Sequence, residues 1–346
     1  MRVNEDIRVQ EVQSCFLCEN EGVPLYQNLR DRLFGVPGFW TLMRCRKCGL
    51  VWLNPRPIPE DIGKLYENYF THDIDNYVPR FSRQRRWIRN AIFSSYLGYN
   101  ELASNMLIRK LGWILSRIGP IKEIAELSSV MTLRKIPNGK LLDVGCGNGG
   151  FLSKMRELGW NVVGIEPDGQ AVKVARETFG LDVHEGTVEE IGFPKDTFDA
   201  ITMNHVIEHV LNPISTLKEC YRVLKPGGKL VIVTPNIESL GHRLFREAWR
   251  GLEPPRHLYL FSPLTLRACA ERAGLQVIKV WTSSRSARFI WAASRLIRQN
   301  GALPGGSPGR QGLWLQLTGL TFWIVEHILC QMRKNAGEEI VLVAMK

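Results

Sequence analysis

The sequence predicts an α/β protein built on a nucleotide-binding β-α-β unit, with a small cysteine-rich module before it and helical segments around it. Three observations predict this fold class. An apolar run leads into the glycine-rich loop Asp143-Val-Gly-Cys-Gly-Asn-Gly149, two CxxC pairs precede that loop, and stretches with helical apolar spacing flank it. Of the 346 residues, 45% are hydrophobic and 23% are charged, which excludes a disordered or fibrous chain.

Residues 1–60 are predicted to form a zinc-binding module. Cys15 and Cys18 form one CxxC pair and Cys45 and Cys48 a second, and each pair places two thiolates on a tight turn. Two such pairs are typical of a closed, tetrahedral structural zinc site. A redox role would need only one pair, and a zinc ribbon that binds nucleic acid would need a basic face, which this electrically neutral block lacks. The first residues show no signal-peptide pattern, so we expect a cytoplasmic protein with reduced thiols.

Residues 61–135 are predicted to form a helical linker or lid. The alternating prolines of residues 53–59 mark its beginning, and apolar residues then recur with helical spacing up to Arg134. Residues 71–135 hold 11 basic and 5 acidic side chains and residues 284–346 hold 8 and 3, whereas residues 1–70 (9 and 9) and 136–283 (17 and 17) are neutral. The whole net charge of +11 therefore lies in two segments that also carry apolar helical stretches.

Residues 136–283 are predicted to form the cofactor-binding core. An apolar strand from Lys140 is followed by the glycine loop and a helix through Leu158. Glycines in this position let the backbone approach a ligand at the helix N-terminus. The next strand ends in Glu166, about twenty residues after the loop, where a nucleotide-binding unit places the carboxylate that accepts hydrogen bonds from ribose hydroxyls.

Residues 284–337 are predicted to form a basic amphipathic helical insertion, and residues 338–346 a final core strand. Arg288, Arg295 and Arg298 alternate with apolar residues, and the apolar run from Leu313 to Val325 is shorter than the roughly 18 residues of a membrane span. An interfacial helix fits this pattern better. We expect peripheral attachment to the inner face of the membrane through residues 71–135 and 284–337. The alternative, a helical cap on the core with solvated arginines, stays open.

The core resembles class I S-adenosylmethionine-dependent methyltransferases, over about residues 138–283 and the last strand. The features that carry the resemblance are, in order, the D-x-G-x-G-x-G loop, Glu166, and strands that match the fourth, fifth and last two of that family, at residues 198–205, 224–236, 275–281 and 339–346. It implies a Rossmann-like seven-stranded sheet and S-adenosyl-L-methionine as cofactor. The implied cofactor-binding residues are Asp143, Gly145, Cys146, Gly147, Gly149, Glu166, Thr187, Val188, Asn204 and His205.

A competing motif overlaps the end of the predicted fourth strand. His205-Val-Ile-Glu208-His209 has the H-x-x-E-H spelling of an inverted zinc-protease helix. We disfavour a metalloprotease, because related methyltransferases often carry Glu-His at this point and no third metal ligand is evident. Packing beside the cofactor or contact with the acceptor explains the pair better.

The candidate general base is His257. It lies in a proline-rigid segment after the fifth strand, where the resembling family builds its acceptor pocket, and a histidine titrates near neutrality. Arg256 beside it is a candidate for holding an anionic group. Glu208, His209 and Tyr259 are the other candidate catalytic residues, and a purely structural His257 stays open.

The acceptor is predicted from the combination of features. A four-cysteine module, this core and the P-x-R-H-L-x-x-F segment are similar to methyltransferases of sugar and polysaccharide biosynthesis, including sugar C-methyltransferases. The extra carboxy-terminal domain of those C-methyltransferases is missing here, so methylation of oxygen is expected at least as much as methylation of carbon. The expected acceptor is a sugar, glycan or lipid-linked glycan. Two alternatives stay open: an isoprenoid or polyketide phenol, and, outside enzymes, a zinc-containing nucleic-acid-binding protein that retains the cofactor fold.

Overall fold

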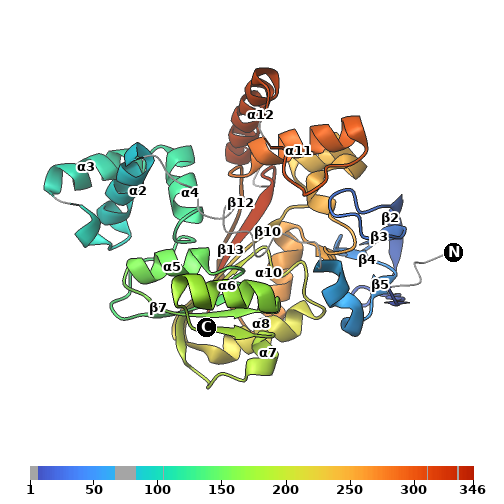
Figure 1. The fold of residues 1–346 in the computed structure, drawn as a ribbon, viewed down its shortest axis with the longest axis horizontal. Coiled ribbons are helices and arrows are strands. Elements are labelled where there is room, and N and C mark those ends of the chain that lie inside the picture. Colours follow the sequence, from blue (N-terminus) through green and yellow to red (C-terminus); the bar gives the residue numbers. More distant parts are fainter. Residues whose placement is uncertain (1–6, 67–82, 104, 310, 333–334) are drawn as a thin grey trace. The chain divides into compact units, whose positions relative to one another are not determined.

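The computed structural model describes residues 7–66, 83–103, 105–309, 311–332 and 335–346, which Figure 1 colours along the sequence. The chain divides into two compact units. Unit 1 comprises Met1–Phe70, Asn204–Leu217 and Ile232–Val343, and unit 2 comprises Thr71–Met203, Lys218–Val231 and Ala344–Lys346.

A seven-stranded sheet forms the core, with strand order β12-β13-β10-β9-β6-β7-β8. β6 pairs in parallel with β7 and β9, and β7 with β8. β13 runs antiparallel to β10, since Gly227 at the start of β10 donates to Lys346 (3.1 Å) and Asn236 beyond its end donates to Glu338 (2.9 Å). The predicted Rossmann-like sheet of seven strands is confirmed. Its strands are β6 (Lys140–Val144), β7 (Asn161–Glu166), β8 (Val183–Glu185), β9 (Phe198–Asn204), β10 (Leu224–Pro235), β12 (Gln276–Ser283) and β13 (Glu339–Met345).

Helices alternate with the parallel strands, as the repeated β-α pattern dictates. They are α5 (Gly150–Glu157), α6 (Gly169–Phe179), α7 (Val188–Ile191) and α8 (Pro213–Val223). The central strands β6 and β9 are mostly buried, which is typical of strands covered on both faces.

A helical segment precedes the core in unit 2. It contains α2 (Arg83–Tyr96), the short η3 (Asn100–Leu102), α3 (Met106–Leu115) and α4 (Gly119–Leu127). α2 and α3 pack closely at Gly112, where an added Cβ would lie 1.9 Å from the backbone oxygen of Ala91. Residues 67–82 and 104 of the predicted lid lie outside the described residues, and the division into five segments stays a prediction.

The N-terminal module in unit 1 is a small antiparallel sheet of order β11-β4-β3-β2. Its strands are β2 (Gly22–Leu29), β3 (Trp40–Cys45), β4 (Val51–Leu53) and β11 (Tyr259–Leu260), and a separate pair joins β1 (Val9–Gln10) to β5 (Arg56–Pro57). η1 (Pro59–Tyr66) follows. β11 comes from the segment that carries the predicted base, and Tyr259 pairs with Trp52. The N-terminal module and that segment are therefore one sheet.

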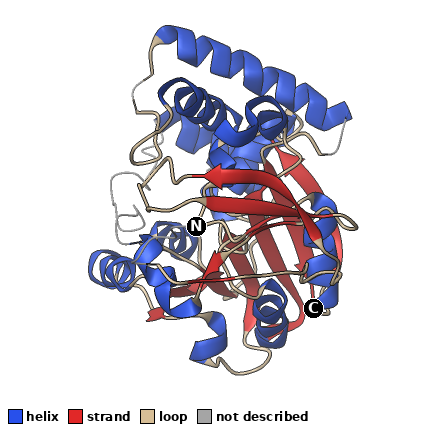
Figure 2. Ribbon diagram, turned by 90° about the vertical axis from the view of Figure 1, so that its right-hand side faces the viewer, coloured by secondary structure: helices blue, strands red, loops and turns tan. Residues whose placement is uncertain are grey.

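The remaining elements of unit 1 follow β10. They are α9 (Leu240–Phe245), η4 (Arg246–Ala248), η5 (Arg250–Leu252), α10 (Pro263–Arg272), α11 (Ala287–Asn300) and α12 (Leu313–Met332). α12 is a long helix that packs on α11 (Figure 2), and the ring of Trp291 stacks on that of Phe322 with centroids 4.9 Å apart.

Candidate functional site

The glycine loop after β6 forms the predicted cofactor cradle in unit 2. Gly145, Gly147 and Gly149 have φ of 71°, 53° and 80°, in the left-handed region that favours glycine. A Cβ on Gly149 would also lie 2.5 Å from Leu181 Cδ1, so a larger residue has no room there. α5 begins at Gly150, whose amide donates to Asn148 Oδ1 (3.1 Å), and the positive N-terminal end of a helix favours a ligand with acceptor atoms.

Two buried carboxylates flank this loop. Asp143 accepts a hydrogen bond from the Thr202 hydroxyl (2.6 Å), and Glu166 accepts from the backbone nitrogens of Gly147 (2.8 Å) and Asp168 (3.0 Å). Burial raises the pKa of Asp143 to about 7 and also raises the pKa of Glu166. Within the described part of the chain neither carboxylate has an ion-pair partner. Buried negative charges of this kind fit a cationic ligand, and S-adenosylmethionine carries an ammonium and a sulfonium.

The other predicted cofactor residues occupy the ends of neighbouring strands. Thr187 caps α7, its backbone nitrogen donating to Glu190 (2.8 Å), and Val188 and Cys146 are buried. Asn204 ends β9, and its Oδ1 is buried with no hydrogen-bond partner among the described residues. An orphaned amide oxygen at a strand end is a candidate ligand contact. The cofactor role of each of these residues stays a prediction.

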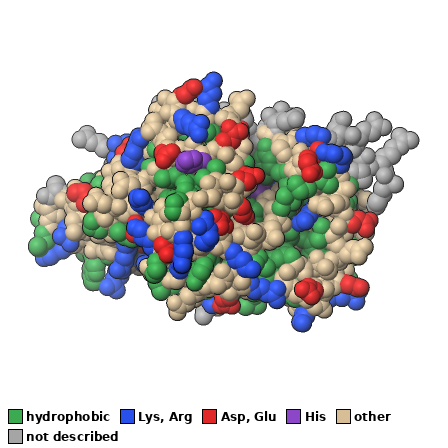
Figure 3. All heavy atoms as spheres, turned by 90° about the horizontal axis from the view of Figure 1, so that it is seen from below, with side chains coloured by type: hydrophobic (Ala, Val, Ile, Leu, Met, Phe, Trp, Pro, Cys, Tyr) green, Lys and Arg blue, Asp and Glu red, His purple; other side chains and the backbone are tan. Residues whose placement is uncertain are grey.

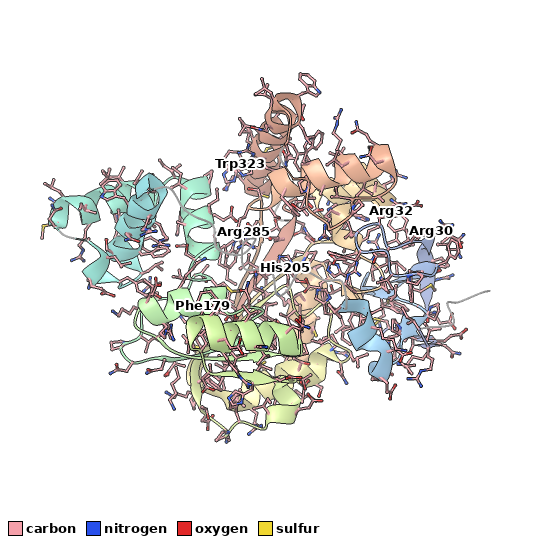
Figure 4. All side chains as sticks on the ribbon, viewed as in Figure 1. Arg30, Arg32, Phe179, His205, Arg285 and Trp323 are labelled. Atoms are coloured by element: carbon pink, nitrogen blue, oxygen red, sulfur yellow. The ribbon has the colours of Figure 1, made fainter. Side chains whose placement is uncertain are left out.

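His205 follows directly after β9, in unit 1. Its φ of 57° is unusual for a side chain with a Cβ, and such strain often marks functional positions. Its Nδ1 donates to Glu208 Oε1 and its Nε2 to Glu339 Oε1, both at 3.2 Å, and Arg285 pairs with Glu339 at 2.9 Å. Figure 4 shows Arg285 and His205 close together. Burial alone would lower the pKa of His205, but the two carboxylates raise it to about 9, so the imidazole is cationic at neutral pH.

Glu208, His209 and His257 bring their donor atoms within 4.8 Å of one another, so this group could hold a metal by composition. Each already has other bonds. Glu208 Oε2 accepts from the Thr234 hydroxyl (2.9 Å), His209 Nδ1 donates to the Arg256 carbonyl (3.0 Å), and His257 Nδ1 donates to the Gly251 carbonyl (2.8 Å). We conclude that the H-x-x-E-H segment takes part in a hydrogen-bond network.

The predicted base His257 is buried. Because Nδ1 carries the proton, Nε2 holds the lone pair, and it lies 3.8 Å from Glu253 Oε2. Burial and the nearby His209 lower the pKa of His257 to about 4, so this imidazole is neutral at pH 7. The ring centroids of His257 and His209 are 4.7 Å apart. The two imidazoles are therefore neighbours in one cluster.

Among the four candidate catalytic residues, His209 keeps the most solvent contact. Glu208, His257 and Tyr259 are buried, whereas His209 is half-buried. The Tyr259 hydroxyl accepts from Arg56 (2.7 Å) and donates to the Leu211 carbonyl (3.1 Å), which ties it into the framework.

Sequence reasoning missed several partners of this cluster. Arg256 pairs with both oxygens of Asp31 (2.9 Å each) and with Glu253 (3.1 Å), so the guanidinium holds the protein's own carboxylates. The Tyr66 hydroxyl lies 3.0 Å from His209 Nδ1. These contacts link positions far apart in the chain, and no local pattern signals them.

The four predicted zinc ligands come together in the N-terminal module. Cys15 Sγ lies 3.5 Å from Cys48 Sγ and Cys18 Sγ 3.3 Å from Cys45 Sγ, and all four sulfurs lie within 4.8 Å of one another. A tetrahedral zinc with Zn–S bonds of about 2.3 Å separates its sulfurs by roughly 3.8 Å. The donor set therefore fits zinc.

The core of this chain is similar in sequence to known methyltransferases. A family model described as a methyltransferase domain matches residues 118–280. The mitochondrial ubiquinone biosynthesis O-methyltransferases of Rattus norvegicus and Homo sapiens are 32% and 35% identical, over 49% and 40% of this chain and 57% and 42% of their own. The ubiquinone biosynthesis O-methyltransferase of Xanthomonas axonopodis pv. citri is 33% identical over 46% of this chain and 74% of its own. The chain spans about half the length of most of these curated relatives.

Solved structures give similar matches. A methyltransferase from Archaeoglobus fulgidus is 20% identical, with 60% of this chain and 86% of that chain covered and a TM-score of 0.41. A phosphoethanolamine N-methyltransferase from Haemonchus contortus is 18% identical, with 86% and 63% covered and a TM-score of 0.44.

Proposed function

The chain belongs to the class I S-adenosylmethionine-dependent methyltransferases, and we propose that it methylates a hydroxyl oxygen of a sugar or glycan acceptor. The names of the curated relatives favour oxygen over carbon as the methylated atom. The single observation that carries the acceptor class is the chain of ionised groups Arg285, Glu339, His205 and Glu208, in which His205 keeps 38% of its side chain exposed. Such groups suit an acceptor with several hydroxyls.

Asp143, Glu166 and the backbone of the Gly145–Gly149 loop would hold the cofactor. When bound, S-adenosylmethionine supplies an electrophilic methyl group on a cationic sulfur. The buried carboxylates neutralise a cationic ligand, and the glycines leave room for it beside the backbone.

We assign the role of general base to the His209–His257 pair, with His209 as the group that takes the proton from the acceptor hydroxyl. Its partial exposure gives a substrate access that His257 lacks. The carboxylates of Glu208 and Glu253 interact with both imidazoles and stabilise the positive charge that a proton would bring. His257 positions His209 and does not itself touch the acceptor.

Label transfer tests this function. Purified protein is incubated with methyl-labelled S-adenosylmethionine and with nucleotide sugars, lipid-linked saccharides or isoprenoid catechols. We expect label in a methyl ether of a saccharide, and at least a hundredfold loss of kcat in His209→Gln. His257→Gln should lower kcat less. Label in C-methyl groups, or an unchanged kcat in His209→Gln, would contradict the proposal.

A second acceptor class is an isoprenoid phenol. The names of the curated relatives, which refer to ubiquinone biosynthesis and not to sugars, favour it. Label recovered in a catechol methyl ether, with none in saccharide, would establish this class instead. Nucleic acid stays the least expected partner: on the face drawn in Figure 3, Lys and Arg side chains are interspersed with Asp and Glu and form no continuous basic stripe.

Structural zinc and an inner-membrane location belong to the same proposal. Zinc held by the four cysteines would join the turn before β2 to the turn between β3 and β4, and near-stoichiometric zinc in purified protein tests this. Membrane attachment through residues 71–135 is supported by α3, where Met106, Leu107 and Trp113 are 70%, 76% and 51% exposed. Cell fractionation with antibody detection tests the location: recovery with the cytoplasmic face of the membrane supports it, and recovery in a secreted fraction refutes it.

A further inference from the structure

The outer face of α12 is mostly apolar and uncharged, with Gln316, Thr321 and Gln331 as its exposed polar residues. α12 has 20 residues. Within the described part of the chain it is the one helix that is long and apolar enough to cross a membrane. Only 17% of its most apolar stretch is buried. No Asp, Glu, Lys or Arg is exposed on it. Its exposed large apolar residues are Leu313, Trp314, Leu317, Leu320, Ile324, Val325, Ile328 and Met332, at 38% to 75% exposure.

The inner face of α12 is fixed to the protein. Gly319, Phe322 and Glu326 are buried at helical spacing. Phe322 stacks on Trp291 of α11, and Glu326 Oε1 accepts a hydrogen bond from the backbone nitrogen of Glu338 (3.0 Å). A span across the bilayer would have to break these contacts and carry Glu326 into lipid. The helix is therefore built to lie on a surface.

Basic residues lie on α11, which packs on α12, and the backbone of Arg288 lies beside Gly319 of α12. Arg288 and Arg298 are exposed and Arg295 is half-buried, and α11 has no acidic residue. Arg295 and Arg298 also border a shallow pocket of about 350 Å³ between α9 and α11, whose other lining is mainly apolar: Leu244, Phe245, Trp291 and Gln299. An apolar pocket with two guanidinium groups suits an anionic headgroup with its attached chain.

We propose that α12 lies in the surface of a lipid bilayer, with the α11 arginines on anionic headgroups. A second copy of the chain fits this face less well. Packing two α12 helices together would bring two sets of α11 arginines near each other, and the described residues of α11 and α12 expose no acidic side chain to pair with them. Lipid supplies both the apolar medium and the negative charge. The proposal does not depend on which acceptor is methylated.

Vesicle flotation of the full chain tests the proposal. We compare vesicles of phosphatidylcholine with vesicles that also contain phosphatidylglycerol. The Leu313→Glu/Leu317→Glu double variant should bind both kinds roughly tenfold or more weakly than the unaltered protein. Leu264→Glu on α10 is the matched control, because Leu264 is 69% exposed and Leu313 73%, and it should bind normally. Arg288→Glu/Arg298→Glu should lose only the added affinity for the anionic vesicles, as should the unaltered protein in high salt.

Folding and association are checked on the same samples. S-adenosylhomocysteine affinity measured by calorimetry should be the same in all variants, which shows that the core is intact. Equal flotation of the Leu313→Glu/Leu317→Glu variant and the unaltered protein would overturn the proposal, and so would no flotation of the unaltered protein. A concentration-dependent dimer in sedimentation that this variant abolishes, with no flotation, would assign the face to a second copy instead.

Discussion

The buried carboxylate Asp143 predicts that cofactor affinity depends on pH near neutrality. Its pKa lies near 7 because the side chain is buried, and the Thr202 hydroxyl only partly offsets this. At a pKa of 7, about nine in ten molecules have an ionised Asp143 at pH 8, and about one in ten at pH 6. If the ammonium of the ligand binds the ionised form, the Kd for S-adenosylhomocysteine should rise roughly tenfold between pH 8 and pH 6, equivalent to about 1.4 kcal/mol.

Calorimetry at half-unit pH steps measures this dependence. Two variants separate Asp143 from other titrating groups. Asp143→Asn should bind weakly and with little dependence on pH, although Glu166 is still present. Thr202→Val removes the hydrogen bond that lowers the pKa of Asp143, so the midpoint of the affinity change should move to higher pH. A Kd for the unaltered protein that is constant from pH 6 to pH 8 would refute the reasoning.

The same carboxylate affects stability with a defined sign. A carboxyl group whose folded pKa exceeds its unfolded value stabilises the folded state below the unfolded pKa, and this contribution is lost as the pH rises through the folded value. For Asp143 the window runs from about pH 4 to about pH 7. The ligand-free protein should therefore lose part of its stability across this window, and bound S-adenosylhomocysteine should reduce the loss.

Three further predictions concern the framework. Asp31→Asn should lower the free energy of unfolding by about 3 kcal/mol, because it leaves the buried Arg256 with one carboxylate fewer; urea denaturation measures this, and a loss below about 1 kcal/mol would contradict it. Cys45→Ser should abolish zinc retention and lower Tm but leave S-adenosylhomocysteine affinity unchanged, since the cofactor residues lie outside the module; retained zinc by elemental analysis would contradict it. Gly149→Ala should weaken that affinity at least tenfold, whereas Gly192→Ala, also at positive φ but with open space around its Cβ, should not; equal effects would refute the steric argument.

Local chemistry made the core predictable. The glycine loop, the carboxylate that ends β7 and the apolar strands are each specified by residues within one β-α unit, so their type and order follow from spacing. The position of the last strand in the sheet cannot be predicted from such local spacing. Residues 339–345 are recognisable as a strand, but their position between β10 and β12 is set by the whole sheet. Glu339 consequently reaches His205 across 134 residues of sequence.

The acceptor-side cluster could be predicted only in part. His209 and His257 stood out as titratable residues in informative segments, but the burial of His257 and its bond to Gly251 depend on packing that no local pattern encodes. Asp31 and Arg256 are 225 positions apart, and their pairing needs the N-terminal module and the base-bearing segment to share one sheet. A strand of two residues, such as β11, is too short to show the alternation of apolar and polar residues by which strands are recognised in a sequence, so this pairing could not be predicted.

The N-terminal module therefore does more than hold a metal. β4 pairs with β11, Arg56 donates to the Tyr259 hydroxyl, and Tyr66 lies against His209, so three parts of the first 66 residues contact the segments that carry the candidate base. Cys15 and Cys18 precede β2, and Cys45 and Cys48 lie at the turn between β3 and β4, so a metal held by all four would fix the start of β4, the strand that pairs with β11. We therefore expect that zinc bound to these cysteines would support the histidine pair through this small sheet. This explains why a module with no open coordination position can still matter for the transfer of a methyl group.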